Sequence, residues 1–309
     1  MLEEQCMNVS QIHQEYSGLL KVRGYFVQSD WHVLEVSGKD RNKFLHNLLS
    51  QHVDEQSVGE RRWSTLLNSK GRLIGFFQVW KLAEKLLLLV HEAQKAEVFK
   101  TLETYWITED LQFKWLEDLQ VISTFVLSKE KLLEGYVYQT NKIVEENPLR
   151  CSVDDYFIPS VQMLVTNEQK KTVTSSAVEM SKNLHECIRI QSAFPLPIQD
   201  YSDPIPLEIP FMHRAISFTK GCYVGQETIA RLHARGLNVS KKLLSFAAPV
   251  DADISVQDLV MLDQTEIGKV TSMGYSPTSQ EKIGLGWIHR NAFDKTVNIK
   301  GQIIKVNHE

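Results

Sequence analysis

Cysteine is scarce in this 309-residue sequence, which contains only Cys6, Cys151, Cys187 and Cys222. None of the four lies in a CxxC or another short spacing that would bind a metal or form a local redox pair. We therefore expect neither a disulfide framework nor a self-contained zinc site.

Long apolar runs are also missing. The longest strongly apolar stretches, Leu73–Trp80 and Leu86–Val90, are far shorter than the roughly 20 residues that cross a membrane. The first twenty residues carry glutamates and lack the basic start and apolar centre of a secretory signal. These absences predict a cytoplasmic protein without a membrane span.

An excess of positive charge is absent too, since the formal net charge is −4, and the whole chain does not indicate nucleic-acid binding. The segment 211–242 differs, because six basic residues there face a single acidic one, Glu227. The six are Arg214, Lys220, Arg231, Arg235, Lys241 and Lys242. Two interpretations stay open for this basic segment: a contact surface for tRNA, or arginines that favour the C-terminal end of their own helix.

Helical and strand periodicities follow one another without a strict βαβ rhythm. Helices are expected at 41–52, 93–106, within 167–183 and at 226–235, and a helix or a flexible arm at 9–20. Strands are expected at 31–36, 64–67, 73–80 and 86–90, and in short pieces across 111–126, 136–149 and 157–165. This order predicts an α+β fold rather than a doubly wound sheet.

Single residues refine these elements. Asp40 is expected to cap the helix at 41–52, Gly71 to supply the turn of a hairpin, and Tyr105 to point inward. The proline-rich segments 194–197 and 204–210 are expected to be ordered loops that reach the centre of the molecule. Short strands between 243 and 306 predict a small β-barrel, so the predicted domains are 1–240 and 241–309.

One stretch has a composition that packing does not readily explain: Lys220-Gly221-Cys222-Tyr223-Val224-Gly225-Gln226-Glu227. Glycines on both sides of Cys222 would allow positive φ and a close approach to the backbone. A lysine and a helix N-terminus nearby favour a thiolate. The alternative is that Cys222 is a small buried hydrophobic residue beside a tight turn.

This stretch resembles the KGCYxGQE signature of the YgfZ/GcvT-type folate-binding family, relatives of the glycine-cleavage T-protein implicated in maintaining iron-sulfur enzymes. Leu67–Arg72 is similar to the family's LxxxKGR hairpin, Arg189–Pro195 to its R-I-E-x-G-x-P segment, and Pro206–Glu208 to its P-x-E element. The resemblance implies two interlocked α+β folate-binding domains and a C-terminal β-barrel, around a channel that holds tetrahydrofolate or a one-carbon derivative.

The resemblance also implies ligand contacts for Trp31, Arg189 and Glu208. An indole face suits the pterin or its neighbouring ring, and a carboxylate can accept bonds from the ring N–H groups. The structural alternatives are a partly buried indole for Trp31, an ion pair for Arg189 and a loop anchor for Glu208. His185 stands at about the place where relatives have a second tryptophan.

Departures from the family narrow the expected function. The T-protein has two aspartates just after the hairpin, where this chain has Gly75 and Phe76, and Gln191 replaces the glutamate of the arginine segment. These losses favour a folate-dependent accessory factor for assembly or repair of iron-sulfur clusters, including those of tRNA-modifying enzymes. The alternative is an aminomethyl or other one-carbon transferase, with His52 or Glu208 as its base.

Within the motif, the accessory-factor hypothesis gives Cys222 the role of the reactive or cluster-contacting thiol. Lys220 would bias it towards thiolate, and Gln226 and Glu227 would hold the loop or the helix start. Because iron-sulfur clusters normally take four protein ligands, one cysteine predicts a transient contact shared with a partner protein.

Overall fold

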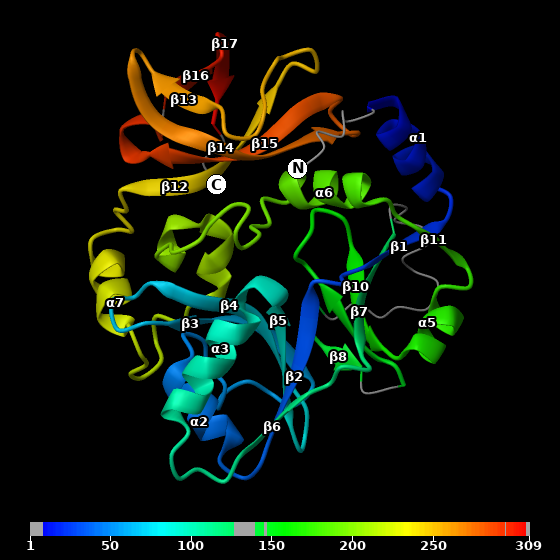
Figure 1. Cartoon of the computed structure of the whole chain (residues 1–309), viewed down its shortest axis with the longest axis vertical. Coiled ribbons are helices and arrows are strands. Elements are labelled where there is room, and N and C mark those ends of the chain that lie inside the picture. The colour runs from blue at the N-terminus through cyan, green and yellow to red at the C-terminus, as the bar shows by residue number, and fades with distance from the viewer. Residues whose placement is uncertain (1–8, 127–139, 145–146, 294, 307–309) are drawn as a thin grey trace.

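A computed structural model describes residues 9–126, 140–144, 147–293 and 295–306. The described residues form three sheets: two lie side by side, and the third, at the C-terminal end of the chain, covers them from above in Figure 1. Apolar clusters join the three sheets. The fold is α+β, as the sequence predicted.

The first sheet has the strand order β3-β4-β5-β2-β6. Its strands are β2 (Trp31–Ser37), β3 (Glu60–Leu67), β4 (Leu73–Lys81), β5 (Leu86–His91) and β6 (Gln112–Trp115). Helices α2 (Arg41–Leu48) and α3 (Glu92–Tyr105) bury their apolar residues against one face. The other face packs on the second sheet.

The second sheet has the strand order β11-β1-β7-β10-β9-β8. Its strands are β1 (Arg23–Val27), β7 (Gln120–Phe125), β8 (Ile143–Val144), β9 (Leu149–Val153), β10 (Ser160–Val165) and β11 (Ala177–Glu179). Strand β1 precedes the whole first sheet in the sequence, yet it pairs with β7 and β11. The chain therefore starts one sheet, builds the other, and returns, which is how the two α+β units interlock.

Three helices belong to the second sheet: α1 (Val9–Leu19), α5 (Asn167–Val173) and α6 (Lys182–Gln191). Helix α6 lies between this sheet and the C-terminal sheet (Figure 1). Its residues Leu184, Cys187 and Ile188 share an apolar cluster with Phe125 of the second sheet and Tyr275 of the C-terminal sheet. This helix carries His185 and Arg189, two of the residues singled out in the sequence.

The C-terminal sheet has the strand order β12-β15-β14-β13-β16-β17. Its strands are β12 (Lys241–Ala248), β13 (Leu259–Leu262), β14 (Thr265–Ser276), β15 (Glu281–His289), β16 (Thr296–Ile299) and β17 (Gln302–Lys305), followed by the bridge between Phe246 and Val306. That bridge joins the first strand to the end of the last, so the sheet curls into the expected small barrel around its own core. The short helix η3 (Arg290–Ala292) connects β15 to β16.

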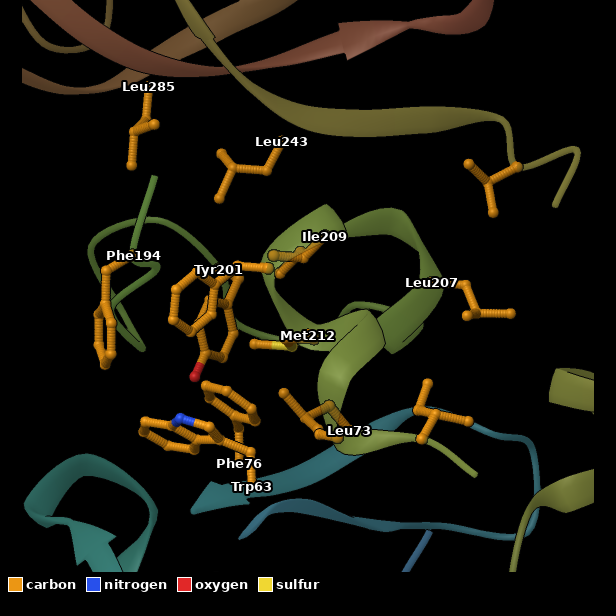
Figure 2. Close-up of a cluster of buried hydrophobic side chains, with 14 of the residues drawn as sticks. Trp63, Leu73, Phe76, Phe194, Tyr201, Leu207, Ile209, Met212, Leu243 and Leu285 are labelled. Carbon is orange, nitrogen blue, oxygen red and sulfur yellow. The ribbon is translucent and has the colours of Figure 1, made fainter. Parts of the chain in front are cut away.

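An aromatic core occupies the centre, where the first sheet meets the proline-rich segments and the barrel (Figure 2). The Trp63 and Phe76 rings stack with centroids 4.3 Å apart and planes 12° apart. Phe194 and Phe211 pack around them, with centroids 5.7 and 6.2 Å from Trp63. The proline-rich segment after Pro204 forms the short helices η1 (Pro206–Glu208) and η2 (Pro210–Ala215), which bury Leu207 and Met212 here. The expectation that these segments reach the centre is confirmed.

Several local predictions are wrong. Helix α2 ends at Leu48 rather than at residue 52, and the Asp40 carboxylate accepts a bond from Asp110 N instead of capping the helix. Tyr105 is 41% exposed because α3 ends there. The helix expected within 167–183 is confirmed as α5, but this region also contains β11, whose pairing with β1 overrides the local helical pattern, and the start of α6. Part of the predicted strand region 136–149 and Cys6 lie outside the described residues.

Candidate functional site

The motif segment 220–227 is a loop that leads into helix α7 (Gln226–Ala234), and buried contacts hold it on the first sheet. The Lys220 ammonium donates to the carbonyl oxygens of His46, Leu49 (2.6 Å) and Gln51 (3.4 Å). These carbonyls lie at and just beyond the C-terminal end of α2, where the helix dipole favours a cation. Burial lowers the pKa of Lys220 to about 8. The ammonium therefore anchors the loop to α2.

The rest of the motif adds further anchors. Tyr223 is buried, and its ring lies 5.3 Å from the Lys220 ammonium. Gln226 donates to the carbonyls of Lys220 and Gly221, and so it closes the loop on itself as the sequence suggested. Glu227 instead pairs with Arg231 on the exposed face of α7.

The two motif glycines do different things. Gly225 has φ +79°, and a Cβ there would lie 2.4 Å from the Asn68 carbonyl oxygen, in the hairpin turn. Gly221 has no positive φ, and a Cβ there would meet nothing within 4 Å. Gly225 is therefore required by the fold, whereas the fold gives no reason for glycine at position 221.

Replacing each glycine by alanine tests this difference. Gly225→Ala is expected to destabilise the protein by roughly 2–4 kcal/mol, because it forces a strained φ and a backbone clash. Gly221→Ala is the matched control and is expected to change the free energy of unfolding by less than about 0.5 kcal/mol. Urea unfolding of both variants measures the difference. Equal stability of the two would contradict the assigned role of Gly225.

Cys222 is exposed, whereas Cys151 and Cys187 are buried. Burial raises the pKa of Cys151 to about 12 and that of Cys187 to about 11, so neither is a reactive thiol near neutral pH. The structure thus decides between the two interpretations of Cys222 in favour of an accessible side chain on a fixed loop. The neighbouring Gly221 lies beside open space, since a Cβ there would meet nothing within 4 Å.

A cavity of about 160 Å³ lies between β2, α6 and the loop after β9, and Trp31 and His185 both line it. Phe194 and Tyr156 add two further rings, stacked at 5.7 Å and 17°. The His185 ring stacks on Phe26, and burial lowers its pKa to about 3, so it is neutral. The structure therefore brings together the two positions where the family resemblance places ring contacts, although His185 lies on a helix rather than a strand.

Arg189 reaches the same cavity but has no free donor. Its five N–H groups are occupied by Glu186, Asp200, Ser272 Oγ and the Phe194 carbonyl. The ion pair considered as its structural alternative describes what the structure shows. Arg189 ties α6 to the segment after it and to strand β14 of the barrel.

Glu208 lies away from this cavity. Its carboxylate accepts a bond from Ile205 N at 3.0 Å and closes helix η1, so it serves as a loop anchor. Burial raises its pKa. Of the three residues expected to contact a ligand, only Trp31 presents a side chain to the cavity that is not already committed to the fold.

A larger cavity of about 750 Å³ lies between the end of α6, η2 and the barrel, and it contains Gln191 and Phe211. None of Trp31, His185, Arg189 or Cys222 lines it. Gln191 bonds Thr278 Oγ1 and Ser276 Oγ. The residues for which ring contacts were expected therefore line the smaller cavity.

The basic segment 211–242 does not form one surface. Lys220 is buried, Arg214 pairs with Asp154 and Asp155, and Arg231 pairs with Glu227. Lys241 and Lys242 lie over the rings of Trp287 and Phe293. The local charge count in the sequence therefore overstates the charge that this segment offers to a partner.

Gly75 and Phe76, which stand where the T-protein has aspartates, face packed surroundings. Phe76 is 2% exposed and stacks on Trp63. A Cβ on Gly75 would lie 2.4 Å from Val98 Cγ2. Position 75 has no room for a side chain, and a carboxylate at position 76 would be buried in the aromatic core.

Comparison with known proteins connects these features. Residues 241–307 match the family model for the glycine cleavage T-protein C-terminal barrel domain. A tRNA-modifying protein YgfZ from Hamiltonella defensa is 23% identical, over 68% of this chain and 66% of that protein. An aminomethyltransferase from Staphylococcus carnosus is 22% identical, over 96% of this chain and 87% of the relative.

The crystal structure of the glycine cleavage system aminomethyltransferase T from Bartonella henselae superposes with a TM-score of 0.82, covering 96% of this chain and 88% of that one at 16% identity. The chain is similar to the YgfZ/GcvT-type family in its motif, its barrel domain and its fold. The fold match covers the interlocked sheets as well as the barrel. The predicted boundary at 240/241 stays a prediction, although β12 and the matched barrel domain both begin at Lys241.

Family resemblance led to Trp31 and His185 but missed Glu186, Tyr156 and Asp200. Glu186 precedes Arg189 by three residues, and this helical spacing could have indicated an ion pair on one face of α6. Asp200 lies in a loop, and no sequence spacing connects it to strand β14. Among the described residues, no group of three or more His, Cys, Asp or Glu side chains could hold a metal ion, and no helix is long and apolar enough to cross a membrane.

Proposed function

We propose that this protein is a tetrahydrofolate-binding accessory factor for the assembly or repair of iron-sulfur clusters, including clusters of tRNA-modifying enzymes. One observation carries the proposal: Cys222 is exposed on a loop that Lys220, Tyr223, Gly225 and Gln226 fix from the inside. A thiol held in this way is preorganised for contact with another molecule rather than for packing.

The cluster is cargo in this proposal, not a resident cofactor. Cys222 supplies one sulfur ligand, and cysteines of the client or of an assembly protein supply the others, since clusters normally take four protein ligands. The described residues offer no second exposed cysteine. The contact is therefore transient and depends on a partner protein.

The folate part of the proposal rests on the cavity around Trp31. Its flat aromatic lining suits a fused heteroaromatic ring, and its volume of about 160 Å³ is below the roughly 300–1,000 Å³ of sites that enclose a whole drug-sized ligand. A folate would therefore place its ring inside and its remaining parts outside. The aminomethyltransferase relatives support folate as the ligand class, and the YgfZ-named relative supports the connection to tRNA modification.

A one-carbon transferase is the alternative, and the site geometry does not favour it. The positions of the T-protein aspartates are filled by packing at Gly75 and Phe76. Glu208 is engaged by Ile205 N, and His52 lies 3.4 Å from Glu55 outside the cavity around Trp31. Contact with tRNA, in our proposal, is made by the client enzyme, because most basic side chains of 211–242 already have partners within the fold.

Cys222→Ala tests the proposal in a bacterial strain that lacks its own relative of this protein. We expect the variant to restore cluster-dependent tRNA modification no better than an empty vector, because the thiol that contacts the cluster is gone. The level of the modified nucleosides, measured by mass spectrometry, is the readout.

Thr219→Ala, an exposed change on the same loop, is the matched control and should rescue like the unmodified protein. Equal protein levels and unfolding temperatures of the two variants exclude a folding defect. Full rescue by Cys222→Ala would refute the role of the thiol.

A further inference from the structure

Glu186 is a carboxylate in the wall of the cavity around Trp31 that the sequence comparison did not single out. It lies on α6 between His185 and Arg189, which also line the cavity. His185 contributes a ring, and Arg189 donates a hydrogen bond to Ser272 of the barrel. The Glu186 side chain is 27% exposed. Its carboxylate is therefore bonded to neighbouring side chains and is also accessible from the cavity.

The hydrogen bonds of Glu186 leave one acceptor position unused. Oε1 accepts from Arg189 Nη2 (2.5 Å) and Gln199 Nε2 (2.8 Å), and Oε2 accepts from Arg189 Nε (2.7 Å). An ionised carboxylate has about four acceptor sites, two on each oxygen. Among the described residues no second donor reaches Oε2, so this oxygen has a site left for a ligand.

Glu186 is also held in its charged form and in one orientation. Burial alone would raise its pKa, but the hydrogen bonds and charge of Arg189 hold the pKa below its ordinary value. The two parallel bonds from Arg189 fix the plane of the carboxylate, and Asp200 fixes Arg189 in turn. A charged acceptor fixed in this way recognises N–H groups of a ligand at little entropic cost.

Rings make up much of the remaining lining, which also contains the polar side chains of Ser29, Asp30 and Lys182. Trp31, His185, Tyr156 and Phe194 surround the cavity with rings, and the neutral His185 adds no positive charge. Gln28, the buried amide in the wall, already bonds Ser123 Oγ, Tyr156 and Gln162. The other carboxylate in the lining, Asp30, accepts a side-chain bond only from the neighbouring Ser29 hydroxyl among the described residues, so Glu186 is the carboxylate that the fold holds in one orientation.

We propose that Glu186 selects the ligand by accepting one hydrogen bond, at the unused site on Oε2, from the exocyclic amino group of a fused heteroaromatic ring that carries the 2-amino-4-oxopyrimidine edge. The assignment rests on the proposed folate site and names its specificity-determining residue. Folates, free pterins and guanine nucleosides all carry this edge.

Tryptophan fluorescence titrations test the assignment, since Trp31 lines the cavity. The unmodified protein, Glu186→Gln and the control Glu168→Gln, an exposed glutamate on α5, are titrated with 5-formyltetrahydrofolate. The same three proteins are titrated with a folate analogue that has hydrogen in place of the 2-amino group. We expect Glu186→Gln to weaken folate binding about tenfold to a hundredfold, the range for a hydrogen bond to a charged group.

The analogue separates ring recognition from a merely structural role. Both Glu186→Gln and the unmodified protein should bind the analogue within about threefold of each other, because the lost bond is absent in both. Equal folate affinity of Glu186→Gln and the unmodified protein would overturn the assignment. An equal loss for folate and the analogue would also overturn it, because it would show that Glu186 only supports Arg189.

Biopterin and guanosine distinguish this assignment from the proposed function. If the unmodified protein binds biopterin or guanosine but no folate, and Glu186→Gln weakens that binding, the ring selection stands and the folate function fails. If folate binds and Glu186→Gln makes no difference, the folate function stands and the assignment fails. Absence of binding for all three ligands would refute the assignment, while the Cys222 experiment would still test the cluster role independently.

Discussion

Asp200→Ala is expected to destabilise the protein by about 3–5 kcal/mol, the range for removing one partner of a buried ion pair. The Asp200 carboxylate accepts from Arg189 Nη1 at 2.8 Å and Leu196 N at 2.9 Å. It also accepts from Thr271 and Ser272 hydroxyls, both at 2.6 Å. Its removal leaves a buried guanidinium half-paired and several buried donors without an acceptor.

The effect should extend to the attachment of the barrel, because Thr271 and Ser272 belong to β14 and Arg189 belongs to α6. Urea unfolding followed by far-UV circular dichroism measures the change in free energy. Asp203→Ala, an exposed aspartate in the same loop, is the control and should lie within about 0.5 kcal/mol of the unmodified protein. An unchanged unfolding midpoint for Asp200→Ala would show that the network does not hold α6 to the barrel.

Phe76→Asp, which restores a carboxylate at a position where the T-protein has one, is expected to abolish folding near neutral pH. Loss of a buried Phe side chain typically costs about 3–5 kcal/mol, and an unpaired buried charge adds several more. The sum is comparable to the 5–15 kcal/mol total stability that is usual for proteins. Near-UV circular dichroism, which reports on the stack between Phe76 and Trp63, is the measurement.

Phe76→Leu is the control for Phe76→Asp, since it keeps an apolar side chain and should cost less than about 3 kcal/mol. The pair separates the effect of the carboxylate from that of the missing ring. A folded Phe76→Asp variant that transfers aminomethyl groups to tetrahydrofolate would contradict our account of the centre and revive the transferase alternative.

Much of the fold could be predicted because its signals are local. The hairpin around Gly71 and the helix after Gly225 were predictable from turn and helix-end residues, and Gly71 has φ +75° as expected. The barrel strands were evident from alternating residues and turns. The pairing of β11 with β1 in the second sheet could not be predicted. Strand β11 has only three residues and takes its conformation from β1, more than 150 positions earlier.

The candidate site was predictable only in part, for the same reason. The motif identified Cys222, but Lys220 has carbonyl partners about 170 positions away that no spacing reveals. Arg189 was singled out by a segment resemblance, yet its role depends on Asp200 and on strand β14. Sequence patterns identify the residues that matter more easily than they identify the partners that fix their roles.

The placement of β1 in the second sheet has a consequence for synthesis on the ribosome. Gly24 pairs with Phe125, 101 positions later, and Arg23 pairs with Ala177 on the opposite edge of β1. At about 5–20 residues per second, β1 emerges some 5 to 20 seconds before its nearest partner strand. Both of its edges stay unpaired while the entire first sheet is being made. The nascent chain therefore carries a strand with two open edges for about a third of translation, from residue 27 to residue 125 of 309, and such edges are where chaperones or other chains can bind.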